Sequence, residues 1–379
     1  MNQPLKHKIP GKPRILVAPL DWGLGHASRC IPIIRELIEQ GSDVWLAGEG
    51  AQETLLKTEF PLLPFLQLPG YRITYSKTST GLIWKMIQQW PKMQKAITAE
   101  NVWLKNVINE YSFDAVISDN RYGLYHPIVP CVFITHQLTI KSPLGKWTEQ
   151  LLQKRNYHYI NRFKECWVPD IKGENNLAGE LSHPVKKPAV PVNYIGLLSR
   201  FEKKEASNDA GDKGNHLLIV LSGPEPQRTL LEEKIINDIS HYNGTATIVR
   251  GLPGSPSLIP STNMIKFYNH LPAAELNKVM QEAELVISRS GYSTIMDILA
   301  LQKKSILIPT PGQTEQEYLG RYLMDKKIIV CCNQENFSVQ QSLAVAKNFQ
   351  YDLPAINNST LLKKAIETFL HQSRKSAFG

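Results

Sequence analysis

His26 stands in a glycine-rich turn, where an imidazole could take part in proton transfer near neutral pH. The turn, GLGH at residues 23–26, follows the apolar run 14–19, which is typical of a buried strand. Asp119 follows a second apolar run, 113–118, in the same way. Because the carboxyl ends of parallel strands meet at one edge of a sheet, we expect Asp119 to hydrogen-bond His26 and to orient its ring.

Other interpretations of these residues remain open. His26 could cap the start of the following helix, and Asp119 could pair with Arg121 and hold its own loop. A third apolar run, 130–135, is followed by His136, which is expected at the same sheet edge.

A second group of polar residues occupies the stretch 284–321. The turn at 288–291 precedes a helical pattern, and free backbone N–H groups at a helix start form an anion site together with the helix dipole. The turn at 309–312 opens another helix, in which Gln316 and Glu317 could bind sugar hydroxyls. A phosphate site followed by hydroxyl-binding side chains suggests a nucleotide sugar. An ordinary βαβ unit with polar loop ends is the alternative.

The elements that must position these residues alternate between strands and helices. This order predicts an α/β fold with two Rossmann-like domains facing a central crevice, a common ligand site. Strands are expected at 14–19, 43–47, 65–68, 113–118, 130–135, 165–168, 216–221, 245–249, 264–267, 285–287, 305–308 and 328–331, and the segment 192–196 leads out of the first half. Helices are expected at 27–40, 82–108, 146–163, 229–240, 272–282, 292–301, 338–347 and 360–371.

The length of 379 residues also favours two domains. We expect an N-terminal acceptor domain at 1–197 and a C-terminal donor domain at 198–358. The final helix, 359–379, is expected to pack back on the N-terminal domain. The polar, charged segment 201–215 reads as a flexible connection near the boundary.

Composition limits the function classes. The chain is 42% hydrophobic and 20% charged, with no apolar run of 18 residues and no secretory signal. Five cysteines without metal-ligand spacing suggest a reducing, cytoplasmic compartment. No Asp-x-Asp pair occurs, so neither a metal nor another cofactor is implied. The net charge of +9 suits phosphorylated ligands or an anionic membrane, whereas scattered Lys and Arg residues argue against nucleic acid.

The segment 82–108 carries an apolar stripe with Lys85, Lys92 and Lys95 beside it. Such a stripe is typical of a core-facing helix. The basic residues, together with Trp84 and Trp90, also permit a peripheral contact with the inner face of a membrane. A near-match to a dinucleotide fingerprint at residues 23–28 lacks its third glycine, which disfavours an NAD oxidoreductase.

Both halves resemble glycosyltransferases of the GT-B fold. The stretch 284–321 is most similar to the C-terminal domain of glycosyltransferase family 28, which includes MurG-like peptidoglycan enzymes. The resemblance implies a diphosphate site around Ser290, a ribose-binding acid at Asp297, where the family uses Glu, and a sugar-binding pair at Gln316 and Glu317, where it often has Gln-Gln. Phe267 and Tyr268 fall where the family binds uracil. Arg200 matches an arginine that contacts the donor phosphate. Ser222 and Gly223 resemble the family's first phosphate loop, although Pro224 and Pro226 replace its usual small residues. The implied donor-binding residues are Gly25, Arg200, Ser222, Gly223, Phe267, Tyr268, Ser290, Gly291, Tyr292, Ser293, Asp297, Gln316 and Glu317.

The function implied by the resemblance is an inverting, metal-independent transfer of a sugar from a nucleotide-diphosphate sugar, expected to be a UDP-sugar, to a hydroxyl of a sugar or lipid-linked acceptor. His26 would act as the base and Asp119 would orient it. GLGHASRC at 23–30 is also similar to nucleotide-sugar hydrolases of the PseG type, in which water would replace the acceptor. A nucleotide-sugar epimerase and a non-catalytic nucleotide-sugar binding protein are further alternatives.

Overall fold

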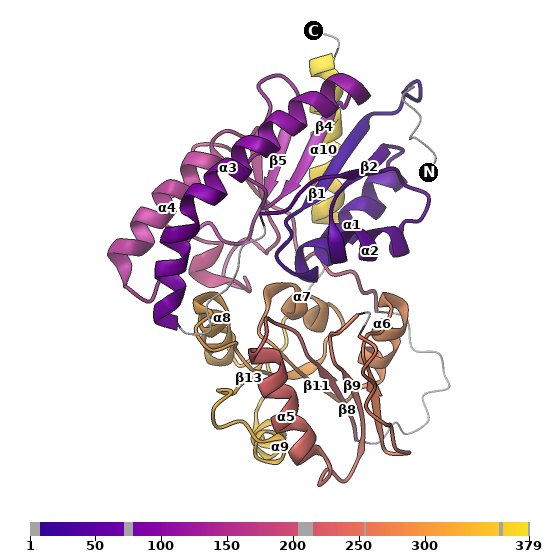
Figure 1. Ribbon diagram of the computed structural model, residues 1–379, viewed down its shortest axis with the longest axis vertical. Coiled ribbons are helices and arrows are strands. Elements are labelled where there is room, and N and C mark those ends of the chain that lie inside the picture. Colours follow the sequence, from indigo (N-terminus) through magenta and orange to yellow (C-terminus); the bar gives the residue numbers. More distant parts are fainter. Residues whose placement is uncertain (1–7, 72–78, 204–214, 254, 356–358, 378–379) are drawn as a thin grey trace. The chain divides into compact units, whose positions relative to one another are not determined.

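The protein forms two compact units, each built on a parallel sheet (Figure 1). The computed structural model describes residues 8–71, 79–203, 215–253, 255–355 and 359–377, and it describes no side chains for residues 79–90, 359 and 374–377. Unit 1 contains most of the chain up to Leu198 together with the C-terminal helix, and Ser199 begins the main part of unit 2. Most of the connecting segment predicted at 201–215 lies outside the described residues.

The sheet of unit 1 has seven parallel strands in the order β3-β2-β1-β4-β5-β6-β7. Its strands are β1 (Arg14–Pro19), β2 (Asp43–Gly48), β3 (Phe65–Gln67), β4 (Ala115–Asp119), β5 (Cys131–Ile134), β6 (Glu165–Val168) and β7 (Val192–Tyr194). The strand order reverses between β1 and β4, and ligands of such sheets bind beyond the carboxyl ends of the strands at that reversal. The two candidate proton-transfer residues predicted from the sequence lie here: His26 follows the turn after β1, and Asp119 ends β4.

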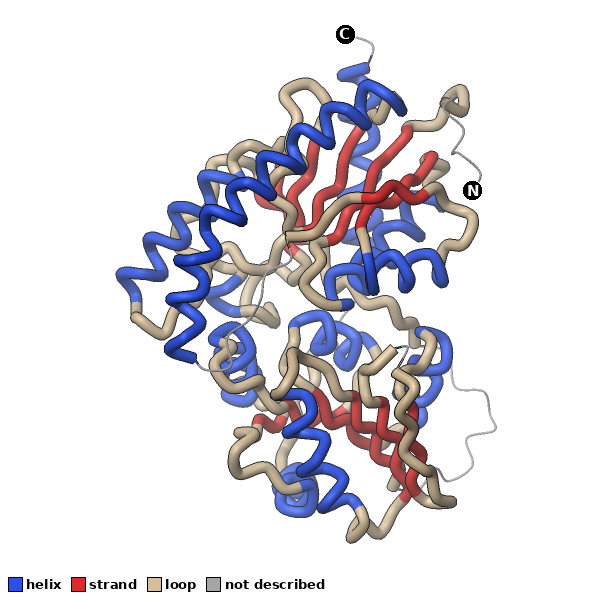
Figure 2. The backbone as a smooth tube through the Cα atoms, in the orientation of Figure 1, coloured by secondary structure: helices blue, strands red, loops and turns tan. Residues whose placement is uncertain are grey.

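Helices cover both faces of this sheet (Figure 2). They are α1 (Leu24–Glu39), α2 (Gly50–Glu59), α3 (Ser79–Tyr111), α4 (Lys146–Ile160), the short 3₁₀ helix η1 (Gly179–Leu181) and α10 (Ser359–Ala377). α3 and α4 pack on one face through a core that includes Leu104, Ile160 and Phe133. α10 packs beside α1 on the other face, where the rings of Trp167 and Phe369 lie 5.6 Å apart.

Unit 2 repeats the strand order of the first six strands of unit 1, as β10-β9-β8-β11-β12-β13. Its strands are β8 (His216–Val220), β9 (Thr245–Val249), β10 (Ile265–Tyr268), β11 (Leu285–Ser288), β12 (Lys304–Leu307) and β13 (Val330–Cys331). Its helices are α5 (Gln227–Ile239), α6 (Ala273–Glu282), α7 (Tyr292–Ala300), α8 (Thr314–Asp325) and α9 (Val339–Asn348). Here the order reverses between β8 and β11, so the turns after these strands are the expected ligand-binding loops.

Three local differences from the sequence expectations matter for the site. α1 begins at Leu24, earlier than the predicted start near residue 27, because Gly23 adopts a φ of 75° and ends the preceding turn. α2 was not predicted, since its sequence has only a weak apolar periodicity. α3 runs through Pro91 as one helix, and the side chains of Trp84 and Trp90 lie outside the described residues. Among the helices of the described residues, none is long and apolar enough to cross a membrane.

Candidate functional site

Four polar side chains gather at the reversal of the unit 1 sheet: His26, Arg29, Asp119 and His136. His26 lies in the first turn of α1, and its Nδ1 atom is 3.2 Å from Oδ2 of Asp119, so the predicted contact is present. The Arg29 guanidinium binds the same carboxylate through Nε, at 2.7 Å, and through Nη2. Its Nη1 atom lies 3.1 Å from Nδ1 of His136, which follows β5. Helix α1, the end of β4 and the loop after β5 therefore contribute to one polar cluster.

The cluster is buried except for part of His26, whose side chain is 14% exposed. Burial alone would raise the pKa of Asp119, but Arg29 and His26 together lower it to about 2, so this carboxylate is charged at neutral pH. Burial is also the main reason why the pKa of His26 lies below its ordinary value of 6.5, and the Arg29 charge lowers it further against the opposing effect of Asp119. At neutral pH His26 is therefore an uncharged imidazole that can accept a proton.

The structure contradicts both alternative interpretations of these residues. The N-cap of α1 is Gly23, and no side chain caps this helix, so His26 is not a capping residue. Arg121 does not pair with Asp119. Its Nε atom donates to Glu100 of α3 at 2.6 Å, because the loop after β4 turns Arg121 toward α3 and away from the strand end.

Glu100 anchors the loop that follows Asp119. Besides Arg121, its carboxylate accepts hydrogen bonds from the Tyr71 hydroxyl at 2.6 Å and from the Gly123 N–H at 3.0 Å. Gly123 has no room for a side chain, since a Cβ atom there would lie 2.4 Å from the carbonyl oxygen of Ile97. These contacts tie the loop after β4 to α3 and so fix the position of the end of β4. Glu100 could not be recognised from the sequence, because it lies inside a long helix with no distinguishing pattern.

At the reversal of the unit 2 sheet, the turn between β11 and α7 contains a buried cation. Arg289 is 1% exposed, and burial lowers its pKa to about 10, so it stays charged at neutral pH. Its Nη atoms donate to the carbonyl oxygens of Gln227 at 2.7 Å and of Ile308 and Pro309 at 3.3 Å. Among the described residues no carboxylate pairs with this guanidinium, and its Nε atom has no hydrogen-bond acceptor. A buried cation without a counter-ion is costly, and a bound anion would offset that cost.

The turn after β8 leaves space beside this cation. Gly223 has a φ of 105°, and a Cβ atom at this position would lie 3.5 Å from Oγ1 of Thr310 and 3.8 Å from Nε of Arg289. The Thr310 hydroxyl is buried and, like Nε, makes no hydrogen bond with the part of the chain that is described. Two unsatisfied polar atoms thus face the same side of Gly223. Gly291, the N-cap of α7, is more open than Gly223, because a Cβ atom there would meet nothing within 4 Å.

The two loops predicted to bind diphosphate and sugar are linked to each other. The Ser290 hydroxyl, which is fully buried, donates to the backbone carbonyl of Gln316 at 2.9 Å. The Gln316 side chain accepts from the Thr310 N–H, and Glu317 accepts from the Gly312 N–H, each at 2.9 Å. One oxygen of Gln316 and one of Glu317 therefore shape the 309–312 turn. The predicted sugar-binding pair acts at least partly on its own loop.

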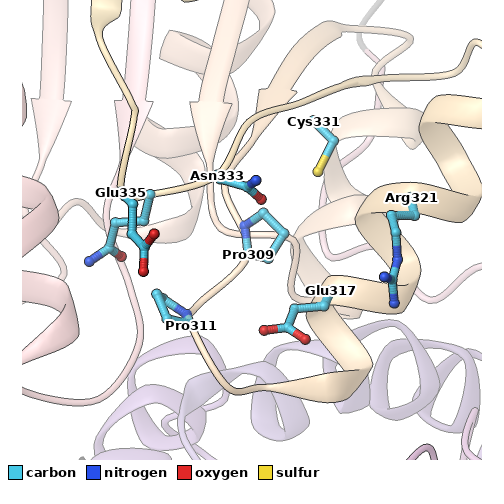
Figure 3. A pocket seen from close by; sticks show the side chains of 8 residues that line it. Pro309, Pro311, Glu317, Arg321, Cys331, Asn333 and Glu335 are labelled. Carbon is cyan, nitrogen blue, oxygen red and sulfur yellow. The ribbon is translucent and has the colours of Figure 1, made fainter. Parts of the chain in front are cut away.

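Glu317 also borders a cavity of about 260 Å³ at the carboxyl ends of β12 and β13. Figure 3 shows its carboxylate beside Pro311, with Asn333 and Glu335 on the neighbouring loop. Proline rings and amide or carboxylate groups together offer both apolar contact and hydrogen-bond acceptors. In unit 1 a second cavity, of about 270 Å³, lies at the turns after β1 and β2, lined by Asp21, Gly23, Glu49 and Gln52 among others.

Asp297 and Arg200, which were predicted to bind the ribose and the phosphate of the donor, contact each other. Asp297 of α7 accepts hydrogen bonds from the Ser199 hydroxyl at 2.8 Å and from the Arg200 N–H at 3.3 Å. The Nε atom of Arg200 lies 3.4 Å from the second carboxylate oxygen. Burial raises the pKa of Asp297, and Arg200 opposes this effect. Asp297 is 6% exposed, so a ribose contact would have to compete with these partners.

The remaining predicted donor residues lie in turns, at two helix starts and on an edge strand. Gly25 is in the first turn of α1, in unit 1, and Ser222 is exposed in the turn after β8. Tyr292 is buried at the start of α7, followed by Ser293. Tyr268, 41% exposed, ends the edge strand β10, while Phe267 packs against the core of unit 2.

Arg29 in unit 1 and Arg289 in unit 2, on which the two polar clusters depend, were not predicted as site residues from the sequence. Arg29 follows His26 by three residues, a spacing that places both on one helix face, and this signal could have been used. Arg289 stands in a polar turn, and nothing in the sequence distinguishes a buried arginine there from an exposed one. In the described part of the chain, no group of three or more His, Cys, Asp or Glu side chains could hold a metal ion.

Residues 262–367 match the model of the glycosyltransferase family 28 C-terminal domain. Among curated proteins, the chain is 22% identical to the UDP-N-acetylglucosamine–N-acetylmuramyl-(pentapeptide) pyrophosphoryl-undecaprenol N-acetylglucosamine transferase of Haemophilus ducreyi, with 85% of each chain covered. It is 25% identical to an uncharacterized glycosyltransferase of Methanosarcina acetivorans, covering 82% of this chain and 81% of the relative.

Solved structures resemble this chain over almost its whole length. The calicheamicin glycosyltransferase CalG4 superposes with a TM-score of 0.61 at 10% identity, covering 97% of this chain and 95% of the other. At this identity the likeness concerns the fold alone.

Proposed function

We propose that this chain, a glycosyltransferase of the GT-B fold whose residues 262–367 form a family 28 C-terminal domain, transfers a hexose from a UDP-sugar to an acceptor hydroxyl. The buried Arg289 guanidinium, which lacks a carboxylate partner among the described residues, carries the proposal. It lies one turn from the α7 N-terminus and beside the open face of Gly223. A cation, a helix N-terminus and a glycine without steric hindrance together suit a diphosphate.

The same arrangement supports transfer without a metal. The leaving diphosphate gains negative charge as the glycosidic bond breaks, and fixed positive groups at that place lower the barrier. Arg289 and the N–H groups at the start of α7 supply such groups, with Ser290 and Gly291 as the nearest residues of the turn. Ser222, Gly223, Tyr292, Ser293 and Arg200 complete the proposed phosphate contacts.

For the rest of the donor, the proposal keeps the assignments implied by family 28. Phe267 and Tyr268 bind the base, Asp297 binds the ribose after exchanging a present partner, and Gln316 and Glu317 bind the sugar. The cavity beside Glu317 supports this last role, because one carboxylate oxygen remains for a sugar hydroxyl after the Gly312 contact.

His26 is the proposed base toward the acceptor. Its uncharged imidazole accepts the proton of the attacking hydroxyl, while Asp119 stabilises the imidazolium that forms. Attack by an activated hydroxyl in one displacement inverts the configuration at the anomeric carbon. Asp21 and Glu49, which border the cavity at the turns after β1 and β2, suit the hydroxyl groups of a sugar acceptor.

A lipid-linked acceptor would bring the chain to a membrane, and unit 1 carries a surface that suits this. Leu144, Trp147 and Leu151 form an apolar stripe on and before α4, with exposures of 62%, 73% and 53%. Lys146 and Lys154 are exposed beside it. We propose a cytoplasmic protein that docks this stripe on the anionic inner face of the membrane. Trp147→Ser/Leu151→Ser should lose co-sedimentation with phosphatidylglycerol vesicles, whereas Leu62→Ser, at a residue 94% exposed elsewhere, should keep it.

The test of the function is product analysis with a panel of UDP-, GDP- and dTDP-sugars, first ranked by thermal shift, which reports binding to the folded state. With a sugar or lipid-linked acceptor, the expected product is a glycoside of inverted anomeric configuration. His26→Ala should lower turnover by about 10²–10⁴-fold with donor binding retained. Release of free sugar at the same rate with and without acceptors would instead indicate a hydrolase. Donor binding without turnover, and no effect of His26→Ala, would indicate a binding protein.

A further inference from the structure

Arg29 is the central residue of the unit 1 cluster. Its guanidinium is 2% exposed and touches three other polar side chains. Nε and Nη2 bind the two oxygens of Asp119, Nη2 lies 2.9 Å from Nδ1 of His26, and Nη1 lies 3.1 Å from Nδ1 of His136. Arg29 therefore neutralises the charge of Asp119 through a two-pronged ion pair, without any need for a protonated His26.

The position of His26 limits the protonation states that it can adopt. Its Nδ1 atom faces a donor, Arg29 at 2.9 Å, and an acceptor, Asp119 at 3.2 Å. With Nδ1 unprotonated the ring accepts from Arg29, and with Nδ1 protonated it donates to Asp119. Either uncharged tautomer therefore has a partner. A doubly protonated ring would place a second positive charge against the guanidinium at hydrogen-bond distance.

We propose that Arg29 is a positioning residue that ties Asp119, His26 and His136 together and holds the His26 ring uncharged, ready to accept a proton. This inference rests on the proposed role of His26 as the base. A buried imidazole next to an aspartate alone would tend to hold a proton permanently, since the carboxylate favours the imidazolium. Arg29 cancels that preference while Asp119 still orients the ring.

Among the described residues, the charged and titratable groups around His26 and Asp119 come from three elements. From α1 come Arg29 and Cys30, whose Sγ atom lies 3.7 Å from Asp119. Burial raises the pKa of the Cys30 thiol well above its ordinary value, so the thiol stays neutral. β4 supplies Asp119, and the loop after β5 supplies His136. Burial, Arg29 and His136 each lower the pKa of His26, and Asp119 alone raises it.

The test is an NMR titration of the His26 ring in the full chain without ligand, with the resonance assigned by its loss in His26→Ala. Arg29→Met removes the charge at similar length and should raise the pKa of His26 by about one unit or more, the usual effect of a charge within about 4–6 Å. Arg29→Lys keeps the charge and should leave the pKa near the wild-type value. The acidic limb of the pH profile of kcat/KM should move in the same direction as the NMR value.

A second pair of variants guards against misfolding, because Arg29→Met leaves Asp119 buried and unpaired. Asp119→Asn and Arg29→Met/Asp119→Asn both lack the carboxylate and differ only at position 29. The pKa of His26 should be higher in the double variant. Equal or lower values in the Arg29→Met member of either pair would overturn the inference. Normal turnover of His26→Ala would refute the proposed base instead, and the NMR outcome would be unaffected by that result.

Discussion

Replacement of Arg289 by Met should weaken the binding of UDP far more than the binding of uridine. The guanidinium is the buried positive charge at the proposed diphosphate site, and its Nε atom is without an acceptor in the described structure. A hydrogen bond between charged groups contributes about 1.5–3 kcal/mol. At about 1.4 kcal/mol per tenfold change in affinity, the dissociation constant for UDP should rise by roughly 10- to 150-fold.

Uridine provides the internal comparison, because it has the base and the ribose but no phosphate. Isothermal titration calorimetry of both ligands separates a charge effect from a general disturbance of unit 2, which would weaken both. Arg289→Lys should fall between wild type and Arg289→Met, since an ammonium group keeps the charge but not the fork of donors that reaches the carbonyls of Gln227 and Pro309.

Arg250 offers a matched control in the same unit. It is also buried, but its charge is paired with Glu232, with Nε at 2.6 Å from the carboxylate. Arg250→Met should lower the melting temperature and leave the UDP affinity nearly unchanged. The reasoning about Arg289 fails if Arg289→Met binds UDP as the wild type does, or if uridine loses affinity by the same factor.

Two substitutions and two pH effects are expected to change the stability of unit 1. Glu100→Gln breaks the buried pair with Arg121 and should lower the free energy of unfolding by about 3–5 kcal/mol in urea titrations; a much smaller loss would contradict the role given to this pair. Gly123→Ala should also destabilise the fold and lower the melting temperature, because its Cβ atom would clash with a backbone carbonyl; an unchanged melting temperature would contradict the geometry. The folded-state pKa of His26 lies below 6.5, so the unfolded state binds more protons and stability should fall as the pH drops through 6.5. The folded-state pKa of Asp119, about 2 against 3.8, adds stability that is fully present above about pH 4 and is lost as the pH falls toward 2. Urea titrations at several pH values check both effects, and His26→Gln should flatten the slope around pH 6.5.

The sheet edges could be predicted from the sequence because strand ends and turns have strong local signals. The apolar runs before His26 and Asp119 place both residues at the carboxyl ends of adjacent strands, and a 3.2 Å contact follows from that topology. The alternation of strands and helices likewise indicated two Rossmann-like domains, and both units have a parallel sheet with helices between its strands.

Partner choice among charged side chains could not be predicted in the same way. Arg121 is two residues from Asp119, yet its partner is Glu100, 21 residues earlier in the chain, because the loop turns it toward α3. Asp297 matched a ribose-binding position, but its nearest partners are Ser199 and Arg200. Such pairings depend on the packing of distant segments, which neither spacing nor periodicity encodes.

The hydrogen bond from Ser290 to the backbone of Gln316 restricts how segments of unit 2 can be exchanged between related proteins. Because Gln316 in turn holds the Thr310 N–H, the first turn, the second turn and the start of α8 depend on one another. A chimera that exchanges either turn alone would lose the hydrogen bonds that link the two turns. Residues 288–317 should therefore be exchanged together as one segment. Glu317 belongs to the same segment, because its carboxylate accepts the Gly312 N–H and so holds the second turn.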